Sequence, residues 1–92
     1  MTDLQTKLIE KVRSFNTSDV EELEEVAELT LQDLFKRYVE TLENKDYHED
    51  CVFLAEDEEE KAEEQVRVEI NDLKSRYYLE ELSLRFFGNK YL

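Results

Sequence analysis

Residues 56–87 read EDEEEKAEEQVRVEINDLKSRYYLEELSLRFF, and this stretch decides the fold. It contains neither glycine nor proline, and its apolar residues recur every three or four positions, or at the sum of the two. This spacing places side chains on one face of an α-helix, so we predict one long helix over 56–87. We expect this helix to end at Gly88, because glycine readily takes the positive φ that commonly ends a helix. The inner stripe of this helix comprises Ala62, Val66, Ile70, Leu73, Tyr77, Leu84 and Phe87.

A second apolar face lies roughly opposite the first stripe of the same helix. A helix that is apolar on two sides must be covered on two sides. One cover is the long helix expected before it, and the other is either the N-terminal helix or another polypeptide. Ordinary core and a partner-binding or dimer contact are therefore both open for Val68, Tyr78, Leu79, Leu82 and Phe86.

Two further helices are predicted before this one. Thr2 with Gln5 forms a capping box, in which a hydroxyl and an amide satisfy backbone donors at a helix start. Ser18 with Glu21 forms a second capping box, and the helix that follows should end at Asn44. The apolar stripes of the two helices comprise Leu4, Leu8, Val12 and Phe15, and Val20, Leu23, Ala27, Leu31, Leu34, Phe35, Tyr38 and Leu42.

The segment 46–55 is open to more than one interpretation. Asp46 with Glu49 could cap a short helix, either separate or continuous with 56–87. The apolar run 51–55 could also form a strand, but a lone strand would leave its backbone groups unpaired. We therefore predict helix for this segment.

The whole composition points to helices as well. The 92 residues include one glycine and no proline. Tight turns in antiparallel sheets depend on glycine, proline, asparagine and aspartate, whereas long helices need none of these inside them. The length suits one domain over 1–92. We predict an all-α fold of three to four helices, in which a long antiparallel helical hairpin, joined through 44–55, carries a shorter N-terminal helix packed on it.

Negative charge is concentrated in two blocks of the chain, whose formal net charge is −13. Residues 19–28 contain six carboxylates and no base, and residues 40–64 contain twelve carboxylates and two lysines, a net charge of −10. The hairpin would place the first block beside Arg76, Arg85 and Lys90 and leave the second unneutralised at its turn. Such a field attracts basic protein surfaces or cations and repels nucleic acid and anionic membrane. The candidate partner-binding residues, which we call the acidic tip, are Glu56, Asp57, Glu58, Glu59, Glu60, Glu63 and Glu64.

No set of residues in the sequence predicts catalysis, and we expect no cofactor. The run His48-Glu49-Asp50-Cys51 groups possible metal ligands, but consecutive residues diverge around a helix. We therefore expect no metal site, and chelators should leave stability unchanged. The segment 44–55 lacks the glycine and the terminal acid of an EF-hand, and the chain has no Gly-rich phosphate loop. A small helical enzyme is the least favoured function.

The sequence also favours a reducing, cytoplasmic location. Cys51 is a single cysteine and cannot form an internal disulfide. The N-terminal residues show no apolar signal segment. The longest apolar run, residues 51–55, is far shorter than a membrane span.

These features favour a non-enzymatic protein that binds another protein. One hypothesis is a nucleic-acid mimic, an inhibitor of the phage type whose carboxylates stand in for phosphates and occupy the basic surface of a nucleic-acid-binding protein. The alternative is a structural or adaptor subunit, or a homodimer, that associates through its aromatic C-terminal helix. The two hypotheses differ in salt dependence, because a mimic loses affinity steeply as salt rises and an apolar contact does not.

Overall fold

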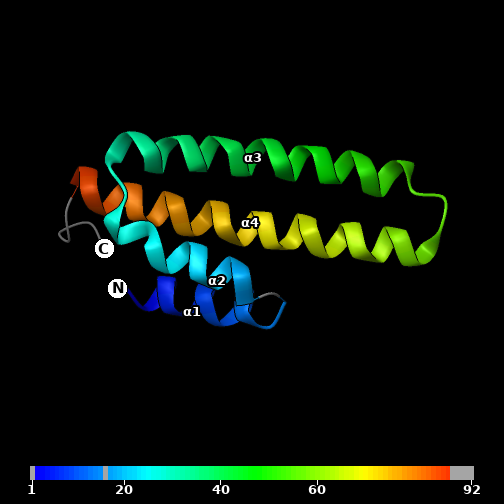
Figure 1. Ribbon diagram of the computed structural model, residues 1–92, viewed down its shortest axis with the longest axis horizontal. Coiled ribbons are helices and arrows are strands. Elements are labelled where there is room, and N and C mark those ends of the chain that lie inside the picture. Colours follow the sequence, from blue (N-terminus) through cyan, green and yellow to red (C-terminus); the bar gives the residue numbers. More distant parts are fainter. Residues whose placement is uncertain (1, 16, 88–92) are drawn as a thin grey trace.

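Two long helices form a hairpin, and two short helices pack beside one end of it (Figure 1). This computed structural model describes residues 2–15 and 17–87. Within these ranges there is no strand, so the predicted all-α fold is confirmed. The elements are α1 (Asp3–Arg13), α2 (Thr17–Glu24), the 3-10 turn η1 (Glu25–Glu28), α3 (Leu31–Leu54) and α4 (Glu58–Phe87).

The start of α1 follows the predicted capping box. The hydroxyl of Thr2 accepts a hydrogen bond from the backbone N–H of Gln5 (3.2 Å), and the Gln5 side chain accepts one from the N–H of Thr2 (3.1 Å). Leu8 and Val12 of the predicted stripe are buried, whereas Leu4 is half exposed. The shorter N-terminal helix contacts α4, as predicted.

The prediction of a single helix from Ser18 to Asn44 is wrong. The segment begins one residue earlier, is broken in the middle, and continues beyond Asn44. Its first part is α2, which begins at Thr17 and passes into η1. Leu29 and Thr30 then take extended backbone, with ψ of 144° and 160°. The Thr30 side chain accepts from the N–H of Asp33 (3.2 Å), so Thr30 caps a new helix, α3.

A side chain from α4 stabilises this break. Arg85 donates to the carbonyl oxygens of Leu29 (2.6 Å) and Val26 (2.9 Å). Carbonyl groups at a helix end have no partner within the helix and are costly to bury unpaired. The Val26 carbonyl also accepts from the backbone N–H of Leu29 (3.1 Å). The guanidinium group therefore adds a second bond there and supplies a donor to the Leu29 carbonyl from 56 residues later in the chain.

At its C-terminal end α3 is longer than predicted. Asn44 lies inside it, and the segment 46–55 extends α3 to Leu54 instead of joining the helix that follows. Asparagine costs only about 0.7 kcal/mol relative to alanine inside a helix, and packing along α4 outweighs that preference. The hairpin turn is therefore short, and Asp57 Oδ1 accepts from the N–H of Glu59 (3.0 Å) where α4 begins.

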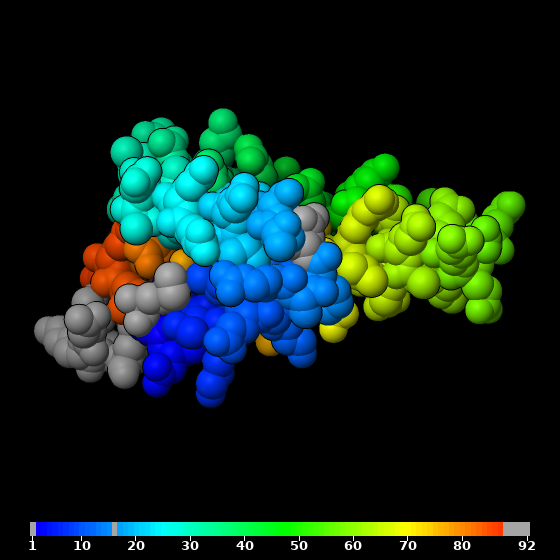
Figure 2. All heavy atoms as spheres, turned by 60° about the horizontal axis from the view of Figure 1, so that its bottom comes forward, coloured from blue at the N-terminus to red at the C-terminus, as the bar shows by residue number. Residues whose placement is uncertain are grey.

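The hydrophobic core lies at the end of the hairpin where α1 and α2 pack. We call residues 40–64 the distal arm, because both views show this half of the hairpin extending away from the short helices (Figures 1 and 2). The distal arm contributes no residue to the core cluster. The whole molecule measures 47 Å by 23 Å by 21 Å. The buried core residues are Leu8, Ile9, Val12, Val20, Leu23, Val26, Leu34, Leu73, Tyr77, Tyr78 and Leu82.

None of the described helices is both long enough and apolar enough to cross a lipid bilayer. Gly88, the predicted end of the last helix, and Lys90, a predicted partner for the first acidic block, lie outside the described residues.

Candidate functional site

The acidic tip lies at the turn of the hairpin, at the free end of the distal arm. Glu56 and Asp57 belong to the turn. Residues 58–60 form the first turn of α4, where carboxylates stabilise the positive end of the helix dipole. Glu64 alone among the tip residues is turned inward, with a side chain only 12% exposed, and the other six are exposed.

Few cations neutralise the distal arm. Lys45 Nζ lies 3.9 Å from Glu49 Oε1 and 3.1 Å from Asp72 Oδ1, and Arg67 pairs with Glu64. No described cation lies within ion-pairing distance of the other carboxylates of the arm, so their charge faces solvent. These carboxylates are Glu40, Glu43, Asp46, Asp50, Glu56, Asp57, Glu58, Glu59, Glu60 and Glu63.

The acidic block over 19–28 is partly neutralised by a buried lysine. Lys74 Nζ lies 3.1 Å from Asp19 Oδ1 and 3.0 Å from Glu22 Oε2, and its side chain is 11% exposed. The Tyr78 hydroxyl donates to Glu22 Oε1 (2.8 Å). Burial acts to raise the pKa of Glu22, but the bonds from Lys74 and Tyr78 outweigh it and hold that pKa below its usual value. Burial and the Glu22 charge together raise the pKa of Tyr78.

Arg85 lies beside this block as expected, because it contacts the Val26 carbonyl, but neither Arg76 nor Arg85 forms an ion pair with a carboxylate of the block. Arg76 pairs with Asp72 of its own helix (3.1 Å), and Arg85 pairs with Glu81 (3.2 Å) as well as with the backbone of η1. Sequence reasoning did not identify Lys74. Its signal was weak, because a lysine on a long helix is ordinarily solvent-exposed.

Three possible metal ligands meet on the inner side of the distal arm. His48 and Cys51 stand three residues apart on α3, and Glu64 reaches them from α4. One ligand atom from each residue lies within 4.8 Å of the other two. His48 Nδ1 is 2.6 Å from Glu64 Oε2. The expectation that this segment lacks converging ligands is therefore wrong for His48 and Cys51.

The surroundings of this cluster fix its side chains. Glu64 Oε1 accepts from the guanidinium group of Arg67, while Oε2 faces His48. The hydrogen bond from His48, together with the positive charge of Arg67, holds the pKa of Glu64 below its usual value. A hydrogen bond to Cys51 raises the pKa of Tyr47, whose ring packs edge-on against the His48 imidazole, with centroids 5.2 Å apart.

Sequence reasoning did not identify Glu64 as a possible metal ligand, because it placed the hairpin turn too early. With the turn at residues 55–57, His48 and Glu64 are equally far from Glu56 along the two antiparallel helices. The spacing of His48 and Cys51 was visible in the sequence, since positions three apart share a helix face. The ligand opposite them could be identified only once the turn was known.

The predicted second apolar face of α4 is divided by the fold. Tyr78 and Leu82 are buried in the core, so they offer no surface to a partner in the folded monomer. Val68 is half-buried, whereas Leu79 and Phe86 are 49% and 65% exposed. The docking prediction is thus restricted to the exposed members of this set.

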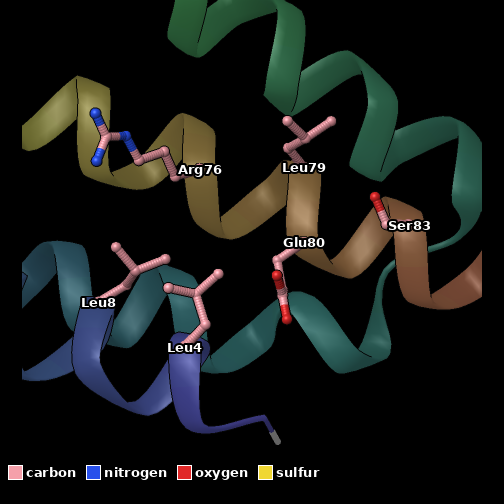
Figure 3. A pocket seen from close by; sticks show the side chains of 6 residues that line it. All are labelled: Leu4, Leu8, Arg76, Leu79, Glu80 and Ser83. Carbon is pink, nitrogen blue, oxygen red and sulfur yellow. The ribbon is translucent and has the colours of Figure 1, made fainter. Parts of the chain in front are cut away.

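Leu79 lines a groove between α1 and α4. Figure 3 shows Leu4 and Leu8 on α1, and Leu79 pointing from α4 toward α3. The groove has a volume of 380 Å³, and Arg76, Glu80 and Ser83 complete its lining. Its walls are apolar leucines with charged groups at the edge.

α3 also exposes apolar side chains that the sequence placed in the core. Leu34 is fully buried, but its predicted stripe partners Leu31, Phe35 and Leu42 are 42%, 57% and 41% exposed. Phe35 and Val39 line a second groove of 490 Å³ on this helix. The apolar stripe of α3 is therefore wider than the contact it makes within the monomer.

Comparison with protein-family models, with curated proteins and with solved structures finds no match for this chain.

Proposed function

We propose that this protein is a non-enzymatic binding module whose distal arm occupies the basic surface of a nucleic-acid-binding protein. The observation that supports this most directly is the charge of the distal arm, a formal net −10 on residues 40–64. Most of these carboxylates face solvent without a cation partner. A field of one sign kept at one end of a molecule speeds encounter with a surface of the opposite sign.

The charge density of the arm is close to that of duplex DNA. Residues 40–54 of α3 rise about 21 Å at about 1.5 Å per residue, and the first turns of α4 run beside them. A net charge of −10 over this length is one charge per about 2 Å of axis. Duplex DNA carries one charge per about 1.7 Å. A basic groove that binds phosphates would therefore meet a comparable field on this arm.

The arrangement of the core supports the same proposal. The short helices pack at the other end of the hairpin, so they do not shield the arm (Figure 1). The other acidic block is partly engaged in internal pairs through Lys74. Negative charge is thus neutralised within the core end and left available for a partner at the distal arm.

The experiment compares two variants that remove the same charge from different places. In the distal variant, residues 58, 59, 60 and 63 change from Glu to Gln, which preserves size and helix propensity. In the matched control, Glu10, Glu21, Glu25 and Glu28 change to Gln, since these carboxylates are exposed and lie at the core end. Each immobilised protein is exposed to lysate of the source cell at low salt. The proteins that it retains are then eluted with competing duplex DNA.

We expect the parent and the control to retain nucleic-acid-binding proteins that DNA releases. The distal variant should retain less of them, and its binding to the purified partner should fall less steeply as salt rises. The proposal is contradicted if the two variants bind alike across a salt titration. It is also contradicted if none of the proteins retained by the parent binds nucleic acid.

A second candidate function is self-association through apolar side chains of α3 and α4. The exposure of Phe35, Leu42, Leu79 and Phe86 favours it, since monomers rarely expose large apolar patches. Sedimentation velocity of the parent and of a Leu79→Asp variant tests this candidate. A parental dimer that the variant converts to a folded monomer would support it, and a monomeric parent at high concentration would exclude it.

A further inference from the structure

We propose that His48, Cys51 and Glu64 bind a divalent ion of the zinc type, which cross-links α3 and α4 in the distal arm. The proposal is independent of partner binding. It replaces the expectation from the sequence that the chain holds no metal site, because that expectation considered only ligands that are adjacent along the chain.

The donor set identifies the class of ion. An imidazole nitrogen, a thiolate sulfur and a carboxylate oxygen are the three ligand types that zinc binds in proteins. Magnesium and calcium prefer oxygen ligands throughout and would not use His48 or Cys51. Three protein ligands leave a fourth position for water or an external ligand, as in open zinc sites.

The geometry is close to that of a bound site. Zinc bonds of about 2.0–2.3 Å at tetrahedral angles place ligand atoms roughly 3.5 Å apart. The three ligand atoms here all lie within 4.8 Å of one another, so the widest pair needs to close by about 1 Å. His48 and Cys51 start on the same face of α3 because they are three residues apart. Side-chain rotation can supply the remaining movement without a change in the backbone.

Neighbouring groups orient these ligands as metal sites require. Arg67 holds Glu64 Oε1, which leaves Oε2 directed at His48. The Tyr47 ring packs edge-on against the imidazole of His48, with centroids 5.2 Å apart. Such outer contacts fix the orientation of ligands and are part of a functional metal site. The side chains of His48 and Glu64 are 20% and 12% exposed, which leaves an ion a path from solvent.

A hydrogen bond between His48 and Glu64 accounts for only two of the three residues. Helix spacing brings Cys51 to the same face as His48, and its sulfur completes a donor set that the hydrogen bond does not use. The net charge of the distal arm also raises the local concentration of cations. The arm has no part in the hydrophobic core, so an ion held by both helices would stabilise the half of the hairpin that apolar packing does not.

Cobalt titration of the reduced, metal-free chain tests the site. Co²⁺ occupies zinc sites and reports on its ligands through visible absorption. We expect a near-ultraviolet charge-transfer band from the Cys51 thiolate, intense visible bands of a four-coordinate ion, and saturation at one ion per chain. Added Zn²⁺ should abolish these bands, and a large excess of Mg²⁺ or Ca²⁺ should not.

Single substitutions then separate a built site from attraction to a negative surface. Cys51→Ser should remove the charge-transfer band, and His48→Ala and Glu64→Gln should weaken Zn²⁺ binding at least about tenfold. Glu63→Gln is the matched control, because it removes the same charge one residue away from an exposed position. This control should bind Zn²⁺ as tightly as the parent.

Thermal unfolding provides an independent readout. Zn²⁺ should raise the melting temperature of the parent and of Glu63→Gln but not that of Cys51→Ser, with circular dichroism showing that all three are helical. Absence of a thiolate-to-cobalt band would overturn the proposal. Equal loss of Zn²⁺ affinity in Glu63→Gln and Glu64→Gln would overturn it as well, because binding would then depend on charge alone.

Discussion

At the scale of single residues, Lys74 determines the electrostatics of the core end. Its ammonium group is nearly buried and touches two carboxylates of α2. Burying a charge without a partner costs several kcal/mol, so Lys74 depends on Asp19 and Glu22 to offset that cost. Tyr78, itself fully buried, ties Glu22 to α4 by a second bond.

Acidification should reduce stability through Glu22. Its folded pKa lies below the unfolded value of 4.5, because contacts with Lys74 and Tyr78, and the charge of Arg37, outweigh burial. Its contribution is therefore present above pH 4.5 and is lost as the pH falls through the lower folded pKa. Urea unfolding between neutral and acidic pH should show a smaller loss for Glu22→Gln than for the parent.

The control for this experiment is Glu21→Gln, which removes an exposed carboxylate one residue earlier. It should show the same loss of stability on acidification as the parent. Asp19 also contacts Lys74 and is unchanged in both variants. Identical pH profiles for Glu22→Gln and the parent would show that Glu22 contributes nothing to acid sensitivity.

Leu79 and Leu82 should respond differently to the same substitution. Leu82 is 5% exposed, so Leu82→Asp buries an unpaired carboxylate and should lower the free energy of unfolding by about 3 kcal/mol or more. Leu79 is 49% exposed, and Leu79→Asp should cost about 1 kcal/mol or less. Urea titrations of both variants measure this difference. Similar losses for the two would mean that Leu79 is as tightly packed as Leu82.

At the scale of elements, some helix ends are determined by residues nearby in the sequence and others by residues far away in it. The capping box of α1 and the apolar spacing repeated along α4 involve residues close together in the sequence, so both could be predicted. The break before α3 has one local signal, the cap that Thr30 makes with Asp33, which the sequence analysis did not use. Its other contacts come from Arg85 on a distant helix and could not be predicted. The turn over 55–57 contains neither glycine nor proline, so the composition did not mark it.

Arg85 should contribute more to stability than other arginines of α4. Replacing it with methionine keeps an unbranched side chain but leaves the carbonyl oxygen of Leu29 without this donor, whereas that of Val26 keeps the N–H of Leu29. An unsatisfied buried acceptor costs about 1–3 kcal/mol, so Arg85→Met should lower the free energy of unfolding by about that amount. Chemical denaturation followed by circular dichroism measures it.

Arg76→Met is the control for this substitution. Arg76 has an exposed side chain and pairs with Asp72 one helical turn away, an interaction of about 0.5 kcal/mol. Its loss should therefore change stability little. Equal destabilisation by the two methionine variants would mean that the backbone contacts of Arg85 do not secure the end of η1.

At the scale of the whole molecule, the two ends of the hairpin are stabilised by different interactions. The core end is held by apolar burial and by a buried ion-pair network. The distal arm has two helices in contact, few buried apolar groups and strong mutual repulsion among its carboxylates. The convergence of His48, Cys51 and Glu64 belongs to this scale, because it depends on the position of the turn and on two helices together.

Amide hydrogen exchange should therefore be faster in the distal arm than at the core end of the hairpin. In the metal-free chain, amides of residues 40–64 should exchange through local opening and faster than those of residues 70–82, which include much of the buried part of α4. Exchange measured by mass spectrometry at low salt provides this comparison.

Changing residues 58, 59, 60 and 63 from Glu to Gln should slow exchange in the arm alone, because repulsion is relieved there. Added salt should slow exchange in the parental arm by the same cause. Uniform exchange along both helices, unaffected by salt, would mean that the hairpin opens as one cooperative unit and that the acidic arm is no weaker than the core.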